Sequence, residues 1–302
     1  MIKVIGIVGA TGSGKTYLSN ILAKKFNGEI INTDASSFRK RLDIGTAKVK
    51  QKEMLVKHHL IDFLNPIEDY SINNFQKDCR GKIESLNSQN KPIFLVGGSM
   101  LYLNSVIYDY QFSTVKRDKS KYLEYSNEEL YEYLLKLDPS LGDKYHLNNR
   151  RRIERAIDLI EDSSLKKKQT ETKVYDALII FLNPERKELY EKINKRVDEM
   201  INEGWIEEVK ALKEDGIDLN LIKEIGYKEL SDYLDGKFSL EDTKKIIAQK
   251  TRNYAKRQIT WYRNKLKCTE LKVDYNNLNE ALAKCDELIR SFLYGKITKS
   301  NS

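Results

Sequence analysis

The chain has few of the residues and segments that mark exported, metal-binding or membrane proteins. Its three cysteines, Cys79, Cys268 and Cys285, lie far apart and show neither CxxC nor Cys/His metal-ligand spacing, which is typical of a protein from a reducing cytoplasm. No apolar run approaches the ~20 residues that a membrane helix needs, and the N-terminus enters an apolar strand without a signal-peptide pattern. We therefore expect a soluble cytoplasmic protein with no membrane partner.

Proline and glycine are also scarce. The 302 residues include 4 prolines and 15 glycines, with no low-complexity tract and no internal repeat, which leaves little room for long disordered linkers. A chain of this length can form one large α/β core and a second, smaller unit. We therefore expect two units.

The charge is unbalanced toward basic residues. Lysine and arginine number 53 against 45 aspartates and glutamates, for a formal net charge of +8. A field of this sign attracts polyanions, and nucleic acid is the leading candidate. A lysine-rich surface without a partner would show the same excess, so sequence motifs must decide between the two interpretations.

A Gly-rich turn that ends in Gly-Lys-Thr organises the N-terminal part of the chain. It lies between a β-branched run at 4–8 and a helical pattern at 17–26, the order of a P-loop. The glycines let backbone N–H groups point inward, the helix adds its positive end, and Lys15 reaches the terminal phosphate, while Thr16 would hold Mg²⁺. The predicted polyphosphate site comprises Gly9, Ala10, Thr11, Gly12, Ser13, Gly14, Lys15 and Thr16. The motif leaves open whether a phosphoryl group is what moves.

Three further apolar runs predict parallel strands at 29–33, 92–96 and 175–182. Asp34 leaves the first of them, and Gly97-Gly98-Ser99 follows the second. Because ligands bind at the carboxyl ends of such strands, we expect Asp34 and Ser99 to face the phosphates. A plain tight turn would also explain the small residues before Ser99. The predicted fold class is α/β, a P-loop NTPase-like parallel sheet flanked by helices, with a helical insertion domain.

A short strand is also expected at 58–64, preceding Pro66. Its two adjacent histidines, His58 and His59, should point to opposite faces and so should not share a metal ion. After the fourth strand the remainder of the chain is predicted to be helical, with a long helix from Pro184 to Glu203 that ends at a glycine.

Residues 112–172 have a different character and predict the helical insertion domain between the core segments 1–111 and 173–302. The insertion is rich in Tyr, Lys and Glu, and its arginines at 150, 151, 152 and 155 lie on one predicted helix, where residues three and four apart share a face. Phosphate binding and a solvated charged face explain this stripe equally well.

A second basic stretch, residues 251–263, mixes Arg and Lys with aromatic residues at helical spacing. Basic groups neutralise phosphates and aromatic faces stack on unpaired bases, so the composition suits single-stranded RNA. An amphipathic core helix with Trp261 buried is the alternative.

Together these pieces resemble the tRNA dimethylallyltransferase (tRNA isopentenyltransferase) family of the bacterial type. The matching stretches are 9–16, 30–48, 58–62, 95–102, 150–156, 225–230 and 251–263. The most specific are Asp-Ile-Gly-Thr-Ala-Lys at 43–48 and Ala-Lys-Arg-Gln-Ile-Thr-Trp at 255–261. The absence of a Cys/His zinc finger after the core favours the bacterial type.

The resemblance implies transfer of a dimethylallyl group from dimethylallyl diphosphate to N6 of the adenosine immediately 3′ of the anticodon in tRNA. It implies that the P-loop with Mg²⁺ holds the diphosphate leaving group and that Asp34 is the general base. Lys228 falls where some members place an Arg that contacts the diphosphate, and Ser99 falls at a position associated with the site. The implied partners are dimethylallyl diphosphate and the anticodon stem-loop of tRNA, bound by a monomer. The implied tRNA-binding residues are Asp34, Ala35, Ser36, Ser37, Ser99, Arg151, Arg152, Arg155, Lys256, Arg257 and Gln258.

The chain departs from the family pattern at three places. After Asp34 the family usually continues Ser-Arg-Gln-Val-Tyr, whereas residues 35–39 are Ala-Ser-Ser-Phe-Arg, which puts recognition of the RNA around the target adenosine in question. Val49 replaces a usual proline, and residues 146–149 replace His-Pro-Asn-Asp.

Three other functions share some of these features. A P-loop nucleotide kinase has the same strand, loop and helix, but neither of the specific later segments. An adenylate isopentenyltransferase would use free AMP or ADP, for which the basic insertion would have no purpose. An RNA-binding protein that has lost catalysis would not need Lys15, Thr16 and Asp34, although the altered stretch after Asp34 keeps this alternative open.

Overall fold

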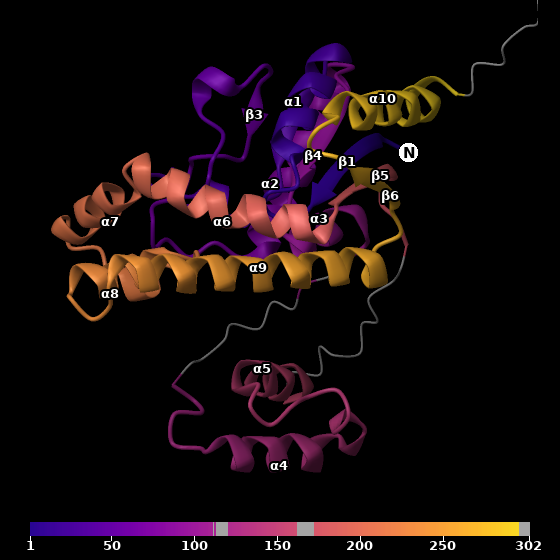
Figure 1. Cartoon of the computed structure of the whole chain (residues 1–302). Helices are drawn as coiled ribbons and strands as arrows, with labels where there is room; N and C mark the ends of the chain where they lie inside the picture. The colour runs from indigo at the N-terminus through magenta and orange to yellow at the C-terminus, as the bar shows by residue number, and fades with distance from the viewer. Residues whose placement is uncertain (111, 113–119, 162–171, 296–302) are drawn as a thin grey trace, which may run out of the picture. The chain divides into compact units, whose positions relative to one another are not determined.

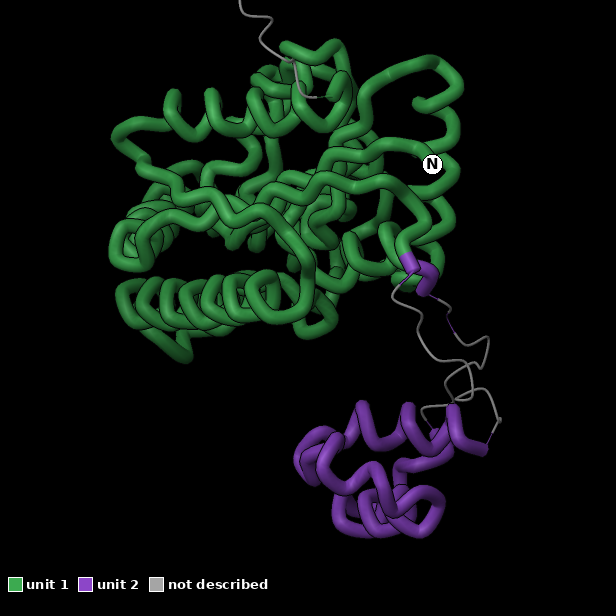
Figure 2. Tube along the Cα trace, turned by 90° about the vertical axis from the view of Figure 1, so that its right-hand side faces the viewer, with its two compact units in different colours: residues 1–108, 173–302 green, residues 109–172 purple. Residues whose placement is uncertain are grey.

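The computed structural model describes residues 1–110, 112, 120–161 and 172–295, and the chain divides into two compact units. The larger unit is Met1–Tyr108 with Lys173–Ser302, and the smaller is Asp109–Thr172 (Figure 2). The insertion was predicted at 112–172; of that range, 113–119 and 162–171 lie outside the described residues.

A six-stranded sheet of parallel strands forms the centre of the larger unit, in the order β3-β2-β4-β1-β5-β6 (Figure 1). The strands are β1 (Lys3–Gly9), β2 (Glu29–Asn32), β3 (His58–His59), β4 (Ile93–Gly97), β5 (Asp176–Pro184) and β6 (Thr269–Val273). Helices cover both faces of this sheet, which is why its central strands read as continuous apolar runs.

The two faces of the sheet bury two separate cores. Val4 and Val8 of β1 contribute to one core and Ile5 and Ile7 to the other, as the alternation of side chains along a strand requires. The first core is completed by α2 (Ile72–Ser88), α3 (Met100–Ile107) and α9 (Leu240–Lys265). The second is completed by α1 (Lys15–Lys25) and α10 (Leu278–Tyr294).

A third apolar cluster joins the helices α6 (Arg186–Asn202), α7 (Trp205–Glu214) and α8 (Tyr227–Leu234) to α9. Helices α6 and α9 lie side by side, with α7 and α8 at one end of the pair (Figure 1). Gly204, at a φ of 101°, separates α6 from α7, a conformation that favours glycine. Helices α6 and α9 form a wall beside the P-loop, because Leu189 of α6 and Ala255 of α9 pack against Ala10.

The smaller unit is helical and has its own core. It contains α4 (Asn127–Leu137) and α5 (Arg150–Glu161), which bury Leu130, Leu134 and Ile153 among other apolar side chains. Ser126 accepts a hydrogen bond from the Glu129 backbone N–H, and the Glu129 carboxylate accepts one from that of Ser126, which stabilises the start of α4. Short 3₁₀ turns occur at Ala35–Phe38, Gln51–Glu53, Pro139–Leu141 and Leu219–Leu221.

Two expectations about secondary structure need correction. The chain after β5 is not wholly helical, because Thr269–Val273 pairs with β5 as a parallel edge strand; its five residues are too few to show this period clearly, and tertiary pairing decides it. The strand expected at 58–64 is limited to two residues, because Leu60 and Asp62 adopt positive φ angles of 55° and 54° that turn the chain away. Within the described residues, no helix is long and apolar enough to span a bilayer.

Candidate active site

The P-loop connects β1 to α1 at the carboxyl edge of the sheet. Gly12 and Gly14 adopt positive φ angles of 83° and 85°, which the turn needs and which glycine adopts without strain. A side chain at Gly9 is excluded, because a Cβ atom there would lie 2.4 Å from Ser13 Oγ and 2.8 Å from the Leu182 carbonyl. The loop lines a polar pocket of about 310 Å³.

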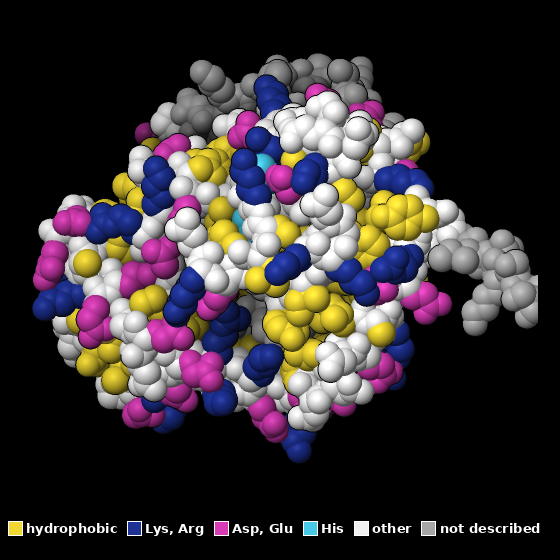
Figure 3. All heavy atoms as spheres, turned by 90° about the horizontal axis from the view of Figure 1, so that it is seen from above, with side chains coloured by type: hydrophobic (Ala, Val, Ile, Leu, Met, Phe, Trp, Pro, Cys, Tyr) yellow, Lys and Arg dark blue, Asp and Glu magenta, His cyan; other side chains and the backbone are white. Residues whose placement is uncertain are grey.

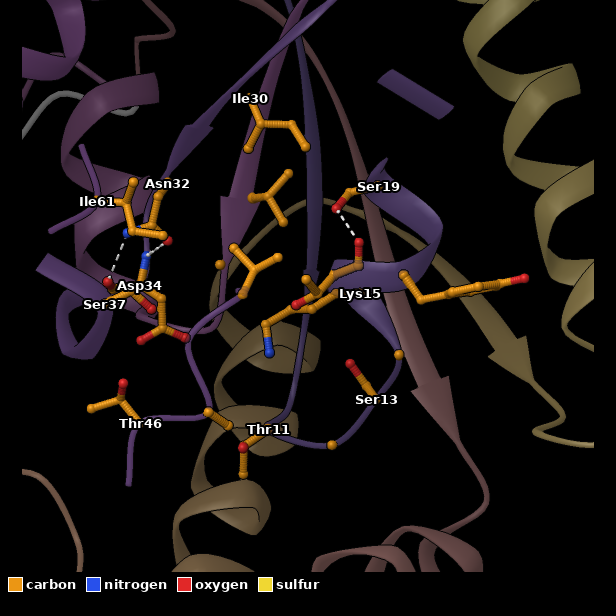
Figure 4. Close-up of a pocket in the computed structure, with 18 of the residues that line it drawn as sticks. Thr11, Ser13, Lys15, Ser19, Ile30, Asn32, Asp34, Ser37, Thr46 and Ile61 are labelled. Atoms are coloured by element: carbon orange, nitrogen blue, oxygen red, sulfur yellow. Dashed lines mark hydrogen bonds between the residues drawn. The ribbon is translucent and has the colours of Figure 1, made fainter. Parts of the chain in front are cut away.

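Cationic side chains from two parts of the chain face this pocket. Lys15 points into it from the start of α1 (Figure 4). Arg196 and Lys192 line it from α6. Burial lowers the pKa of Lys15, with Arg196 acting in the same direction and Asp34 opposing both. Three basic side chains and two carboxylates, Asp34 and Glu199, thus line the pocket, at a helix N-terminus that favours an anion.

Hydroxyl groups in the same pocket suit a hydrated cation bound together with an anion. Ser13 Oγ is buried and has no hydrogen-bond partner among the described residues, and Thr16 lines the pocket beside it. Mg²⁺ in proteins is held by few protein oxygens, with water and substrate phosphates completing its shell. The donor set fits Mg²⁺ carried with a diphosphate; among the described residues no cluster of three or more His, Cys, Asp or Glu side chains offers a metal site of its own.

Asp34 follows β2 and lies on the far side of the pocket from Ser13, with its carboxylate directed inward (Figure 4). Its Oδ1 accepts a hydrogen bond from the Ser36 hydroxyl at 2.7 Å and one from the Ser99 hydroxyl at 3.4 Å. Its Oδ2 accepts one from the Gly98 N–H at 3.2 Å. These donors fix the carboxylate, and the expected meeting of Asp34, Ser99 and the P-loop at one edge is what the structure shows.

A second pocket, of about 390 Å³, adjoins the first and is more apolar. Its apolar walls come from helices beyond the sheet edge and from the turn before α8: Ile193, Val197, Met200, Trp205, Ile225 and Ile247. Five residues line both pockets: Thr11, Asp34, Thr46, Ala47 and Arg196. Asp34 therefore lies at the boundary between a cationic pocket and an apolar one.

The segment Asp43-Ile44-Gly45-Thr46-Ala47-Lys48 forms the wall between the pockets and is held from two sides. The Glu208 carboxylate of α7 accepts hydrogen bonds from the N–H groups of residues 43, 44 and 45 at 2.8, 2.8 and 3.2 Å. The Lys48 ammonium donates to the Asp43 carboxylate at 2.6 Å and also pairs with Asp62. These contacts explain why Thr46 and Ala47 can present their atoms to both pockets.

Comparison with known proteins supports a single family. A profile of the family described as IPP transferase matches residues 38–265. The tRNA dimethylallyltransferase of Finegoldia magna is 40% identical over 97% of this chain and 99% of its own, and that of Anoxybacillus flavithermus is 43% identical over 87% and 88%.

Solved structures support the same family. The full-length tRNA isopentenylpyrophosphate transferase from Bacillus halodurans has a TM-score of 0.74 at 37% identity and covers 97% of each chain. A eukaryotic dimethylallyltransferase acting on tRNA has a TM-score of 0.82 at 29% identity, over 96% of this chain and 80% of its own.

The chain belongs to the IPP transferase family. It is an enzyme of the prenyltransferase class to which these relatives belong, and the α/β fold with the P-loop at the sheet edge is confirmed.

In this IPP transferase, the segment after Asp34 faces both pockets. Ala35 and Ser36 line the apolar pocket and Ser37 the cationic one. Phe38, which stands where the family usually has Val, is buried and stacks on Phe75 with ring centroids 5.4 Å apart. The departure from the family sequence is therefore accommodated in the core, while the three small residues keep their place at the site.

The three residues predicted on α9 to bind tRNA separate into two groups. Lys256 and Arg257 are exposed, and Arg257 also lines the apolar pocket. Gln258 is 1% exposed, and its amide forms hydrogen bonds with the Thr11 N–H and the Gly98 carbonyl. Trp261 is half-buried beside Tyr262, so α9 has a core face and a basic face.

Arginines of α5 present a basic surface on the smaller unit. Arg151 and Arg152 are exposed and Arg155 is half-buried. Arg150 instead donates hydrogen bonds to the Tyr125 carbonyl at 2.7 Å and to Glu154 at 2.8 Å, which is a structural role.

The face of the molecule seen from above carries charges of both signs. Figure 3 shows that basic side chains on this face are interspersed with acidic ones rather than gathered into one patch.

Lys228 is not brought to the P-loop. It is exposed on α8 and is absent from the described linings of both site pockets. Arg196 and Lys192 of α6 supply the cations there instead. Sequence reasoning missed both because α6 reads as an ordinary charged helix; the signal available was their spacing of four residues, which places them on one face.

Proposed function

We propose that this chain transfers the dimethylallyl group of dimethylallyl diphosphate to N6 of the adenosine 3′-adjacent to the anticodon in tRNA. The observation that carries the proposal is the position of Asp34, which lines both the cationic P-loop pocket and the apolar pocket beside it. A diphosphate ester with an apolar tail needs both environments, and the carboxylate lies where they meet.

The first pocket binds and stabilises the diphosphate. The P-loop N–H groups, Lys15 and Arg196 supply positive charge where negative charge develops as the bond between C1 of the donor and its oxygen breaks. An allylic carbon ionises readily once its leaving group is stabilised in this way. Diphosphate departs, and the electron pair of the broken bond leaves with it.

Asp34 acts as the general base in this proposal. The N6 lone pair of adenine forms the new bond to C1, and the amine must then lose a proton. Its lone pair is delocalised into the ring, so a carboxylate that accepts this proton assists the attack. Ser36, Ser99 and Gly98 hold that carboxylate in one orientation by the hydrogen bonds described above.

In this proposal Thr16 would hold Mg²⁺ beside the diphosphate, and the ion would neutralise charge on the leaving group.

The anticodon stem-loop binds along the basic surfaces, through Arg151, Arg152 and Arg155 on the smaller unit and through Lys256 and Arg257 on α9. Phosphate contacts of this kind orient an RNA without reading its sequence. The target adenosine must leave its stack to reach the apolar pocket. We further propose that the enzyme acts as a monomer in the cytoplasm.

The experiment that tests the proposal offers purified protein, Mg²⁺ and radiolabelled dimethylallyl diphosphate three separate acceptors: unmodified tRNA, AMP and ADP. We expect label in tRNA alone, at the adenosine after the anticodon. Label in AMP or ADP would assign the enzyme to free nucleotides. The absence of label in every acceptor, with tRNA still bound, would indicate an RNA-binding protein without this activity.

A further inference from the structure

Gln258 lies on the core face of α9 and joins two loops of the site. It is 1% exposed. Its Oε1 accepts a hydrogen bond from the Thr11 N–H of the P-loop at 3.0 Å, and its Nε2 donates one to the Gly98 carbonyl at 2.8 Å. A polar side chain this deeply buried is costly unless it is bonded, and here both ends of the amide have partners.

The chemistry of the partners fixes the orientation of the amide. A backbone N–H can only donate and a carbonyl can only accept, so the oxygen of Gln258 must face Thr11 and the nitrogen must face Gly98. The bond also occupies the Thr11 N–H, which is therefore turned toward the protein and away from a bound diphosphate. Thr11 can contribute its hydroxyl to the pocket, but not this donor.

The connection continues from Gly98 to the general base. Gly98 accepts from Gln258 through its carbonyl and donates to Asp34 Oδ2 through its N–H. A Cβ atom at Gly98 would lie 2.5 Å from Gln258 Nε2 and 3.2 Å from Asp34 Oδ2, so only glycine fits between them. A chain of hydrogen bonds thus runs from the P-loop through Gln258 and Gly98 to Asp34.

The helix that carries Gln258 is anchored on both sides of it. Ala255 packs against Ala10, Leu189 and Ile193 directly beneath the P-loop. Tyr262 is fully buried and stacks on Phe181 of β5, with centroids 5.3 Å apart. These positions, three residues before and four after Gln258, share its face of the helix, so the amide is held rigidly to the sheet.

We infer that Gln258 is a positioning residue that sets the distance between the P-loop and the carboxylate of Asp34. The inference rests on the proposed function, in which the first holds the leaving group and the second takes the proton. Gln258 does not touch tRNA in this account, whereas its neighbours Lys256 and Arg257 do. Its substitution should therefore affect the rate of transfer rather than RNA binding.

The test is Gln258→Glu, assayed at saturating tRNA and donor. The carboxylate can still accept from Thr11, but it cannot donate to Gly98 and repels that carbonyl. We expect kcat to fall about 10- to 100-fold, as small misplacements of reacting groups do, while the Kd for tRNA stays within about 2-fold of wild type. An unchanged kcat with a weakened Kd for tRNA would overturn the inference.

The pH dependence of the transfer rate distinguishes a positioning role of Gln258 from a general structural defect. A protonated carboxyl group donates a hydrogen bond, so acid should restore the contact to Gly98 in Gln258→Glu. The ratio of variant to wild-type rate should then rise as pH falls, with titrations common to both proteins cancelling. Gln258→Met, which loses both contacts and carries no charge, should show the same rate loss and a flat ratio.

The matched control is Gln249→Glu, the same change at an exposed position of the same helix, which should keep wild-type kcat. Thermal unfolding of each variant reports folding, and Gln258→Met tests the inference if Gln258→Glu does not fold. Wild-type kcat in Gln258→Met would contradict it. A wild-type protein that labels no acceptor would refute the proposed function instead, so the two failures are distinguishable.

Discussion

The two adjoining pockets of the site differ in how much one continuous segment contributes. The lining of the cationic pocket includes an unbroken run from the P-loop into α1, Thr11 to Tyr17, which more distant residues such as Lys192 and Arg196 of α6 complete. The described lining of the apolar pocket comes from residues between 11 and 257, on α6, α7, α9, the turn at Ala35–Phe38 and several loops, with no continuous run longer than three residues. A site made by local backbone geometry tolerates few substitutions, whereas one made by distant side chains can change its shape while the fold persists.

Lys15→Ala should produce the largest loss, because it removes the cation nearest the expected leaving group. We expect kcat/KM for dimethylallyl diphosphate to fall about 10³-fold, with tRNA affinity unchanged. Steady-state kinetics at saturating tRNA measure this. Lys24→Ala, at the exposed end of the same helix, is the control and should behave as wild type.

Arg196→Ala should weaken donor binding in the same pocket, because it removes a cation of α6 that no sequence motif indicated. A charged hydrogen bond to phosphate is worth about 1.5–3 kcal/mol, so KM for the donor should rise about 10- to 100-fold. Lys228→Ala should leave KM within about 2-fold of wild type, because Lys228 lies outside the pocket linings. The reverse result would return the diphosphate contact to Lys228.

Removing charge from Arg151 and Arg152 together should affect tRNA binding alone. We expect the Kd for tRNA to rise about 10-fold and the slope of log Kd against log salt to flatten by about 1 to 2. Binding measured at several salt concentrations provides both values. Lys136→Ala, on α4 of the same unit and exposed, should change neither; an unaltered slope in the arginine variant would mean that these residues are only a solvated face.

His58 should make the smallest contribution, to stability rather than to catalysis. Burial lowers its pKa to about 4, with His59 acting in the same direction, so the folded state prefers the neutral ring. The free energy of unfolding is therefore unaffected by this group above the unfolded pKa of about 6.5, and it decreases as the pH falls toward 4, because the unfolded state binds the proton more readily. The loss has an upper bound of about 3 kcal/mol, reduced by the partial exposure of the ring.

His58→Gln should remove this part of the acid sensitivity while still donating to Asn20 Oδ1, which lies 3.0 Å from His58 Nε2. Urea unfolding at pH 7 and pH 5 measures it. The free-energy difference between the two proteins should shrink or reverse at the lower pH. A difference independent of pH would exclude His58 as the titrating group.

Sequence alone could predict the half of the site that depends on local geometry. Glycines, Lys15 and Thr16 form a pattern whose spacing dictates the turn, and the rule that loops meet at the carboxyl ends of parallel strands places Asp34 and Ser99 beside it. The structure shows these groups together, and its likeness to solved family members confirms the fold.

The other half depends on contacts between distant segments, which no local pattern encodes. Arg196 and Trp205 reach the apolar pocket only because α6 and α7 pack beyond the sheet edge. Gln258 directly follows two basic residues in sequence, Lys256 and Arg257, yet faces the core. Its burial could be anticipated only from Ala255 and Tyr262 on the same face, a weak signal beside the basic residues around it.

In the proposed reaction Asp34 accepts a proton from the acceptor adenosine while the P-loop holds the donor, and Asp34→Asn separates these two roles. The change keeps the shape of the side chain and removes the proton acceptor. In a single-turnover experiment with saturating labelled donor and tRNA, we expect transfer at least about 100-fold slower than wild type, with the Kd values of donor and tRNA within a few-fold of wild type. Transfer at the wild-type rate would exclude Asp34 as the general base.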